Sequence, residues 1–157
     1  LGLAKQSKSP VVLVCTSGTA ALNFGPAVAE AFFSEVPLIL ITADRPEESI
    51  GQADNQSIHQ AQLYGKHVLY SGIIPASHSI TQSSAFALRQ MNEALLVSIG
   101  NPSGPVHLNV PLREPLYITE KEFDLLQNDN PKIIAKHIPN YNFEFNSELK
   151  KKLNYYF

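Results

Sequence analysis

The sequence has very little of what would indicate disulfide bonds or a membrane span. It contains a single cysteine, Cys15. One cysteine cannot form a disulfide within the chain, which favours a reducing compartment such as the cytoplasm. No run of apolar residues is long enough to cross a bilayer. We therefore expect a cytoplasmic protein without a membrane span.

Charged residues are also few, at 17% of the chain with a formal net charge of -2. No basic run follows one face and no Lys/Arg stripe alternates with aromatic residues, so we expect no nucleic-acid partner. The histidines are scattered without the spacing of metal ligands, and we predict no metal site from them. They are His59, His67, His78, His107 and His137.

Short apolar runs are what the sequence does have. Residues 10–15 and 37–42 are apolar without alternation, which is typical of strands buried on both faces. The other strand candidates are 67–70 and 105–110. The helix candidates are 20–34, 58–63 and 81–99, and Gly25 with Pro26 predicts a kink or a late start in the first of them.

Strands that alternate with helices predict an α/β fold, with a parallel sheet flanked by helices on both faces. The chain has 157 residues, of which 44% are hydrophobic, enough for one such core. After about Tyr117 the composition shifts to Asn and Pro, as in a linker. Leu1 lies inside a helix-like run and the last residues are aromatic. We therefore expect a truncated piece of a longer polypeptide.

The first candidate site is the turn Thr16-Ser17-Gly18-Thr19, directly after the first predicted strand. Ligands of parallel sheets gather beyond the carboxyl ends of the strands, and free N–H groups at a helix start can hold an anion. The alternative, which the turn taken alone favours, is a capped helix in which Gly18 eases the turn. The turn has neither the dinucleotide-binding glycine spacing nor a Walker Gly-Lys-Ser/Thr motif.

The second candidate is Asp44-Arg45-Pro46, which follows the second predicted strand. Pro46 biases Arg45 toward an extended backbone, and an arginine can grip a carboxylate with two parallel hydrogen bonds. A surface loop capped by Asp44 is equally compatible with this segment taken alone.

The third candidate is the polar run 51–57, in which the amides of Asn55 and Gln56 could orient carboxylates or hydroxyls. A polar turn before a helix is the simpler interpretation. Elsewhere we expect Cys15 to be a small buried apolar residue and His107 to be a core or edge histidine with satisfied hydrogen bonds. We expect Arg113 and Glu114 to be solvated.

Taken together, these segments resemble a known family. The run Val12 to Ala21 resembles the strand, turn and helix of the pyrimidine-binding domain of thiamine-diphosphate enzymes. The motif Thr42 to Pro46, followed by Ala53 to Gln56, is similar to the isochorismate-consuming synthases of menaquinone biosynthesis. Residues 104–116 resemble the closing strand and exit loop of that group. The resemblance implies a pyrimidine-binding domain over 1–118 that lacks its start, and a linker and the start of a middle domain over 119–157.

The resemblance also implies which residues act. Carried over, Arg45, Asn55 and Gln56 bind isochorismate, and Thr16 to Thr19 lie near the cofactor or a subunit interface. This chain departs from the family pattern in one place. The family usually has Gly-Ala-Asn-Gln where this chain has Ala53-Asp54-Asn55-Gln56. The family's activating Glu falls upstream of Leu1, so we expect no catalytic residue in this chain. Its Gly-Asp-Gly…Asn motif for Mg²⁺ and the diphosphate has no counterpart here.

The reaction implied by the resemblance is a thiamine-diphosphate-dependent, C–C bond-forming transfer. 2-Oxoglutarate is decarboxylated, and its succinyl-semialdehyde unit adds to isochorismate. The enzyme would be a homodimer or homotetramer that uses Mg²⁺, and this chain alone would be inactive. Two alternatives stay open: another thiamine-diphosphate enzyme, such as an acetolactate-synthase-like protein or a 2-oxoacid decarboxylase, and a non-catalytic α/β binding module.

Overall fold

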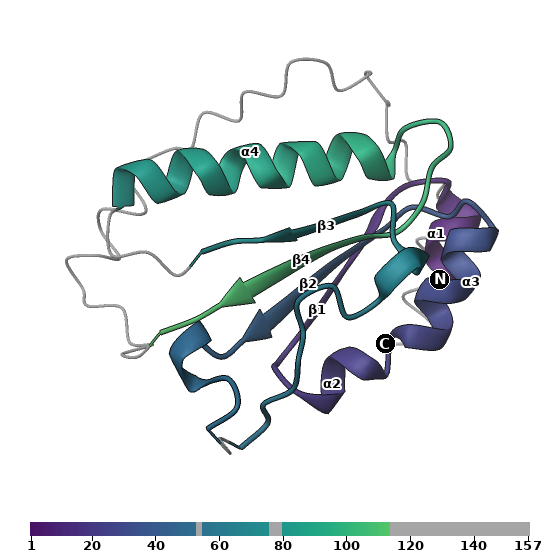
Figure 1. The fold of residues 1–157 in the computed structure, drawn as a ribbon. Coiled ribbons are helices and arrows are strands. Elements are labelled where there is room, and N and C mark those ends of the chain that lie inside the picture. The colour runs from purple at the N-terminus through teal and green to yellow at the C-terminus, as the bar shows by residue number, and fades with distance from the viewer. Residues whose placement is uncertain (53–54, 76–79, 114–157) are drawn as a thin grey trace, which may run out of the picture.

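The computed structural model describes residues 1–52, 55–75 and 80–113. These residues form a four-stranded parallel sheet in the order β1-β2-β4-β3, with helices on both faces (Figure 1). The predicted fold class is therefore confirmed. The strands are β1 (Val11–Cys15), β2 (Leu38–Asp44), β3 (Tyr70–Ile73) and β4 (Val106–Pro111). The helices are α1 (Gly2–Ser7), α2 (Thr19–Leu22), α3 (Gly25–Phe33) and α4 (Ile80–Ser98), with 3₁₀ turns η1 (Glu47–Ser49) and η2 (Gly65–His67).

The central strand β2 connects two apolar layers because successive side chains point to opposite faces. Leu38 and Leu40 are fully buried against α1 and α3, where Val28 is among their neighbours. Ile39 points the other way and packs with Ala94 of α4. Helices thus cover both faces of the run 37–42, completely on the α3 side and partly on the α4 side, where Ile39 and Ile41 are half-buried.

Strand β1 does not follow the prediction of burial on both faces. It lies at the edge of the sheet, and its burial alternates. Leu13 packs into the core, whereas Val12 is 52% exposed and Val14 is 70% exposed. Helix α4 packs on β2, β3 and β4, so the outer face of β1 has no helix over it among the described residues. The expectation that residues 10–15 are buried on both faces is wrong, because an apolar run does not reveal its place in the strand order.

The helix predictions vary in accuracy. The segment 20–34 is two helices, because α2 ends at Leu22 and α3 begins at Gly25 with Pro26 in its first turn. The predicted interruption at Gly25 and Pro26 is confirmed, as is the long helix α4. The helix predicted over 58–63 is wrong: residues 57–60 have no helical structure, and 61–64 form turns. Tertiary hydrogen bonds of this segment, described below, override its local preference.

The strand predicted over 67–70 lies three residues later, at β3, since Tyr70 pairs with Val106 in the parallel register. Among the described residues, no helix combines the length and the apolar character that a bilayer span requires. The predicted linker over 119–157 lies outside the described residues, as do Ala53, Asp54, His78, Glu114 and His137.

Candidate functional site

Two of the predicted segments lie side by side at the carboxyl edge of the sheet. The turn 16–19 follows β1 and Arg45 follows β2, and these strands are parallel neighbours in which the last residue of β1, Cys15, lies opposite Thr42, two residues before the end of β2. This is the edge at which parallel sheets hold their ligands.

Gly18 brings the third segment into contact with this edge. Its φ of 81° and ψ of -142° belong to a region that is essentially restricted to glycine. A Cβ at this position would lie 2.8 Å from the backbone oxygen of Gln56. The 16–19 turn is therefore packed directly against the backbone of the 55–60 segment. Helix α2 begins here with Gly18 as its N-cap residue and without a side-chain capping hydrogen bond, so Gly18 eases the turn as the structural alternative expects.

Arg45 is held at the end of β2 by its neighbours. Its backbone N–H donates to Asp44 Oδ1 at 2.8 Å, and its Nη2 donates to the backbone oxygen of Asn55 at 3.3 Å. The Nε of Arg45 is buried and has no hydrogen-bond partner among the described residues. Burying a donor without a partner costs about 1–3 kcal/mol. The structure thus brings Arg45, Asn55 and Gln56 to one place and leaves one charged donor unsatisfied there.

Beneath these residues lies a buried polar network that the sequence analysis missed. Gln60 is fully buried, and its side chain reaches three segments of the chain. Its Oε1 accepts from the N–H of Gly18 at 2.6 Å, and its Nε2 donates to the backbone oxygen of Ala43 at 2.8 Å. The same Nε2 lies 3.1 Å from Oδ1 of Asn109. Gln60 therefore joins the ends of β1, β2 and β4.

Strands β2 and β4 supply the rest of this network. Asn109 Nδ2 donates to Asp44 Oδ2 at 2.7 Å, and Thr42 Oγ1 donates to Asn109 Oδ1 at 2.9 Å. The same hydroxyl lies 2.8 Å from Nε2 of His107. A usable signal exists in the sequence: His107 and Asn109 are polar residues two positions apart in a strand, and so share one face.

The hydrogen-bond directions in the network are fixed by its backbone ends. Gly18 N–H can only donate and the Ala43 carbonyl can only accept, so the orientation of the Gln60 amide is determined. Thr42 has one proton and gives it to Asn109, so its oxygen must accept from His107 Nε2. His107 is therefore the neutral tautomer with its proton on Nε2.

The other ring nitrogen of His107, Nδ1, is buried without a partner among the described residues. The expectation of a core histidine is right, but the expectation of satisfied hydrogen bonds is wrong for this atom. Burial lowers the pKa of His107 to about 4, because the charged imidazolium would lose its hydration. This histidine stays neutral near neutral pH.

Two further groups near the network are poor proton donors. Tyr64 donates to the backbone oxygen of Ala21 at 2.7 Å, and its ring meets that of His107 edge-on at 4.9 Å. Burial, with a smaller contribution from Cys15, raises the pKa of Tyr64 to about 12. Cys15 is only half-buried rather than fully buried, and burial raises the pKa of its thiol. Neither group is suited to nucleophilic or acid–base chemistry near pH 7.

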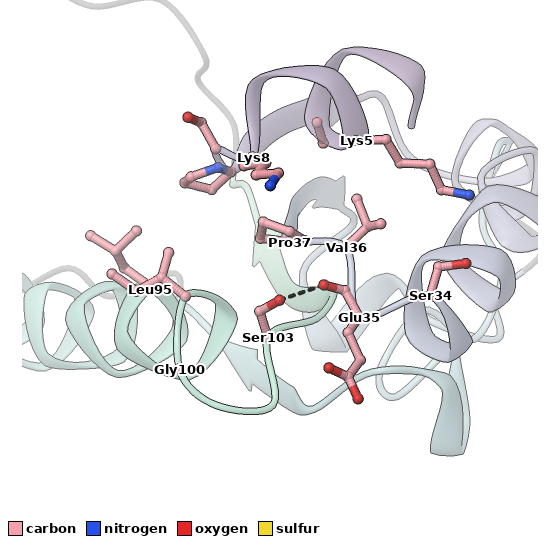
Figure 2. A pocket seen from close by; sticks show the side chains of 13 residues that line it. Lys5, Lys8, Ser34, Glu35, Val36, Pro37, Leu95, Gly100 and Ser103 are labelled. Atoms are coloured by element: carbon pink, nitrogen blue, oxygen red, sulfur yellow. Dashed lines mark hydrogen bonds between the residues drawn. The ribbon is translucent and has the colours of Figure 1, made fainter. Parts of the chain in front are cut away.

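No group of three or more His, Cys, Asp or Glu residues suited to a metal occurs in the described part of the chain. A cavity of about 680 Å³ opens at the opposite, amino-terminal edge of the sheet, beside Pro10 and Pro37 (Figure 2). Figure 2 shows the hydroxyl of Ser103 donating to the backbone oxygen of Glu35 at its wall. This cavity contains none of the residues predicted for substrate or cofactor.

Arg113 lies in an exposed ion pair. Its Nη2 donates to Glu48 Oε2 at 2.9 Å, and both side chains are solvent-accessible. Arg113 is thus exposed in this chain, and its expected neighbour Glu114 lies outside the described residues.

Comparison with known proteins places the chain among enzymes that use one cofactor. Residues 1–63 match the family described as thiamine pyrophosphate enzyme, N-terminal TPP binding domain. This match covers the first 63 of the 157 residues, and the parallel α/β sheet of the described residues is consistent with it. Thiamine pyrophosphate is also called thiamine diphosphate.

Similar proteins within this family share one name, 2-succinyl-5-enolpyruvyl-6-hydroxy-3-cyclohexene-1-carboxylate synthase. The chain is 40% identical to that of Cytophaga hutchinsonii over 139 residues, which is 88% of the chain and 24% of the relative. It is 47% identical to that of Lysinibacillus sphaericus over 137 residues, which is 87% of the chain and 23% of the relative. It is 49% identical to that of Listeria monocytogenes over 116 residues, which is 74% of the chain and 20% of the relative. The chain spans about a quarter of the length of the first of these relatives.

Proposed function

We propose that the complete protein containing this sequence is a thiamine-diphosphate-dependent synthase of menaquinone biosynthesis. It decarboxylates 2-oxoglutarate and adds the remaining succinyl-semialdehyde unit to isochorismate. The names of the similar proteins support this proposal, together with 40% identity over 88% of the chain.

The observation that carries the proposal is the state of Arg45. Its guanidinium is partly used by Asn55, while its buried Nε has no partner among the described residues. Isochorismate carries two carboxylates, and a carboxylate removed from water needs charged donors. A substrate carboxylate at Arg45 would satisfy the Nε, with the side-chain amides of Asn55 and Gln56 as additional donors.

The donor set here suits one end of the cofactor. Around Gly18 the buried side chains, Ser17 and Gln60, are neutral, which suits an uncharged aminopyrimidine ring. The described residues offer no carboxylate cluster for Mg²⁺. We therefore place the pyrimidine end near Thr16 to Thr19, and the Mg²⁺ and diphosphate on residues beyond this chain. When bound, the cofactor supplies the nucleophilic carbon for decarboxylation and C–C bond formation.

The proposal extends to the organisation of the protein. Residues 1–118 would be the pyrimidine-binding domain, and 119–157 the linker and the start of a middle domain. The last described strand, β4, ends at Pro111, close to that boundary. We further propose a homodimer or homotetramer that works in the cytoplasm, where a single cysteine such as Cys15 stays reduced.

A substrate comparison tests the function. The purified complete gene product is assayed with thiamine diphosphate and Mg²⁺, using 2-oxoglutarate plus isochorismate in one series and pyruvate in the other. We expect turnover only in the first series. Turnover of pyruvate alone would indicate an acetolactate-synthase-like enzyme or a decarboxylase. Failure to bind thiamine diphosphate would indicate a non-catalytic binding module.

A further inference from the structure

We infer that Gln60 is a positioning residue, which holds the proposed isochorismate-binding loop and the proposed cofactor-binding turn in one fixed arrangement. The inference rests on the proposed function for the meaning of these two segments. The anchoring itself follows from the contacts of Gln60 alone.

Gln60 is unusual in its burial. A glutamine side chain is ordinarily exposed, yet this one is fully buried. Its amide offers one acceptor oxygen and two donor hydrogens. All are used: the oxygen accepts from Gly18, and the two hydrogens go to Ala43 and Asn109. A buried amide whose oxygen and both hydrogens are engaged has one favourable orientation.

In that orientation Gln60 contacts both segments that are predicted to bind ligands, the loop 55–60 and the turn 16–19. Gln60 lies four residues after Gln56, so it ends the loop that carries Asn55 and Gln56. Through Gly18 N–H it also fixes the turn against which the Gln56 backbone packs. If Gln60 loses its hydrogen bonds, the loop and the turn lose the same anchor. The two binding functions should then weaken together.

The network also gives Gln60 a defined route to Arg45. Gln60 and Thr42 both donate to Asn109 Oδ1, and the Asn109 amide donates to Asp44. Asp44 accepts from the backbone N–H of Arg45 through its other oxygen. Gln60 thus supports Arg45 without touching the substrate, which is the reason for calling it a positioning residue.

The test uses Gln60→Met in the complete gene product, because methionine keeps the length and apolar bulk but removes every hydrogen bond. Gln62→Met is the matched control, since Gln62 is exposed and lies two residues away. Hydrogen exchange at residue resolution reports the anchor, and steady-state kinetics report the positioning. Thermal melting shows whether each variant is folded.

In Gln60→Met we expect faster exchange at Gly18 and over residues 55–60. We also expect kcat/KM for isochorismate to fall about ten- to a hundredfold, with a parallel rise in the apparent Kd for thiamine diphosphate. KM for 2-oxoglutarate should change much less. Gln62→Met should leave all of these values unchanged.

The possible outcomes separate the two proposals. Faster exchange with unchanged kinetics would overturn the positioning role, and unchanged exchange would overturn the anchor. A wild-type protein without synthase activity would overturn the proposed function, while the exchange data would still decide the anchor. If Gln60→Met does not fold, the wild type alone is decisive: the Gly18 amide must be protected from exchange, and an unprotected amide refutes the inference.

Discussion

At the scale of single residues, the site depends on a few groups that only one residue type can supply. Arg45 is one of them, because its planar guanidinium contacts Asn55 and its buried Nε has no partner among the described residues. Lysine would keep the charge but could not offer a second, parallel hydrogen bond.

We predict that Arg45→Ala in the complete protein lowers kcat/KM for isochorismate about ten- to a hundredfold, the equivalent of roughly 1.5–3 kcal/mol for one charge-assisted contact. Arg45→Lys should recover only part of this loss. Arg89→Ala on the far helix α4 is the charge-matched control, since Arg89 is exposed there. Wild-type kinetics in Arg45→Ala would show that Arg45 does not bind the substrate.

Gly18 is a second such residue, for reasons of backbone geometry. Gly18→Ala would add the strain of a φ of 81° to a 2.8 Å approach to Gln56. We expect a loss of about 1–3 kcal/mol from the strain alone and a displaced 55–60 loop. Gly51→Ala is the control, because Gly51 has the same φ of 81° but no atom within 4 Å of an added Cβ. Chemical denaturation measures the cost of the backbone strain, and the KM for isochorismate reports displacement of the loop. Equal KM values in both variants would contradict the role of the close approach between Gly18 and Gln56.

His107 makes the stability of the fold depend on pH. Its pKa falls from 6.5 in the unfolded chain to about 4 in the fold. Between these two pH values the unfolded state binds more protons than the folded state. The contribution of His107 to the free energy of unfolding is therefore complete above pH 6.5 and is lost as the pH falls toward 4. We predict a loss of roughly 2 kcal/mol between about pH 7 and 5.

The loss should disappear in His107→Gln, which cannot titrate but can still donate to Thr42. The free energy of unfolding at the two pH values is the measurement. His59→Gln, at an exposed position, is the control that should retain the loss. An unchanged pH dependence in His107→Gln would show that another group causes it.

At the scale of helices and strands, sequence reasoning works where the local pattern decides the structure. The apolar runs at β2 and the long periodic segment at α4 form the elements they predict. The pattern fails where distant contacts decide. No local signal places β1 at the sheet edge. The segment 58–63 is kept from forming a helix by two hydrogen bonds of the Gln60 side chain, which accepts from Gly18 N–H and donates to the Ala43 carbonyl.

The exposed outer face of β1 leads to a prediction about stability. Val14→Ala should cost the 157-residue chain less than about 1 kcal/mol, because its side chain is already 70% exposed. Leu40→Ala, at a fully buried position of β2, should cost about 2–5 kcal/mol because it leaves a cavity. Denaturant titration of both variants is the measurement. Similar losses in both would mean that the outer face of β1 is covered in solution.

At the scale of the whole molecule, the candidate site is partly predictable. Arg45, Asn55 and Gln56 are accessible to sequence reasoning because their motif resembles that of a family, and in the structure Arg45 donates to the backbone oxygen of Asn55. The supporting network is not accessible in the same way. Thr42, Gln60 and Asn109 are brought together by three different segments, and a local pattern cannot report which buried polar groups will find one another.

The affinity of the isolated chain for the cofactor is limited by the groups that the chain contains. We predict that the isolated 157-residue chain binds thiamine diphosphate and Mg²⁺ more weakly than micromolar and has no synthase activity. The charge on this ligand lies in the diphosphate and its metal, and such groups are held by ionic and metal contacts. Among the described residues there is no metal-binding cluster, and the neutral surroundings of Gly18 can offer only ring contacts and backbone hydrogen bonds.

Calorimetry measures thiamine diphosphate binding by the purified chain, with the complete gene product as positive control. We expect heat of binding only from the complete protein. The Gln60→Met variant of the complete protein should have an affinity for thiamine diphosphate between these two. It keeps the residues that bind the diphosphate, but loses the hydrogen bond that supports the 16–19 turn. Micromolar binding by the isolated chain would mean that the diphosphate site lies within residues 1–157. It would contradict the resemblance, which implies that this site lies in another part of the protein.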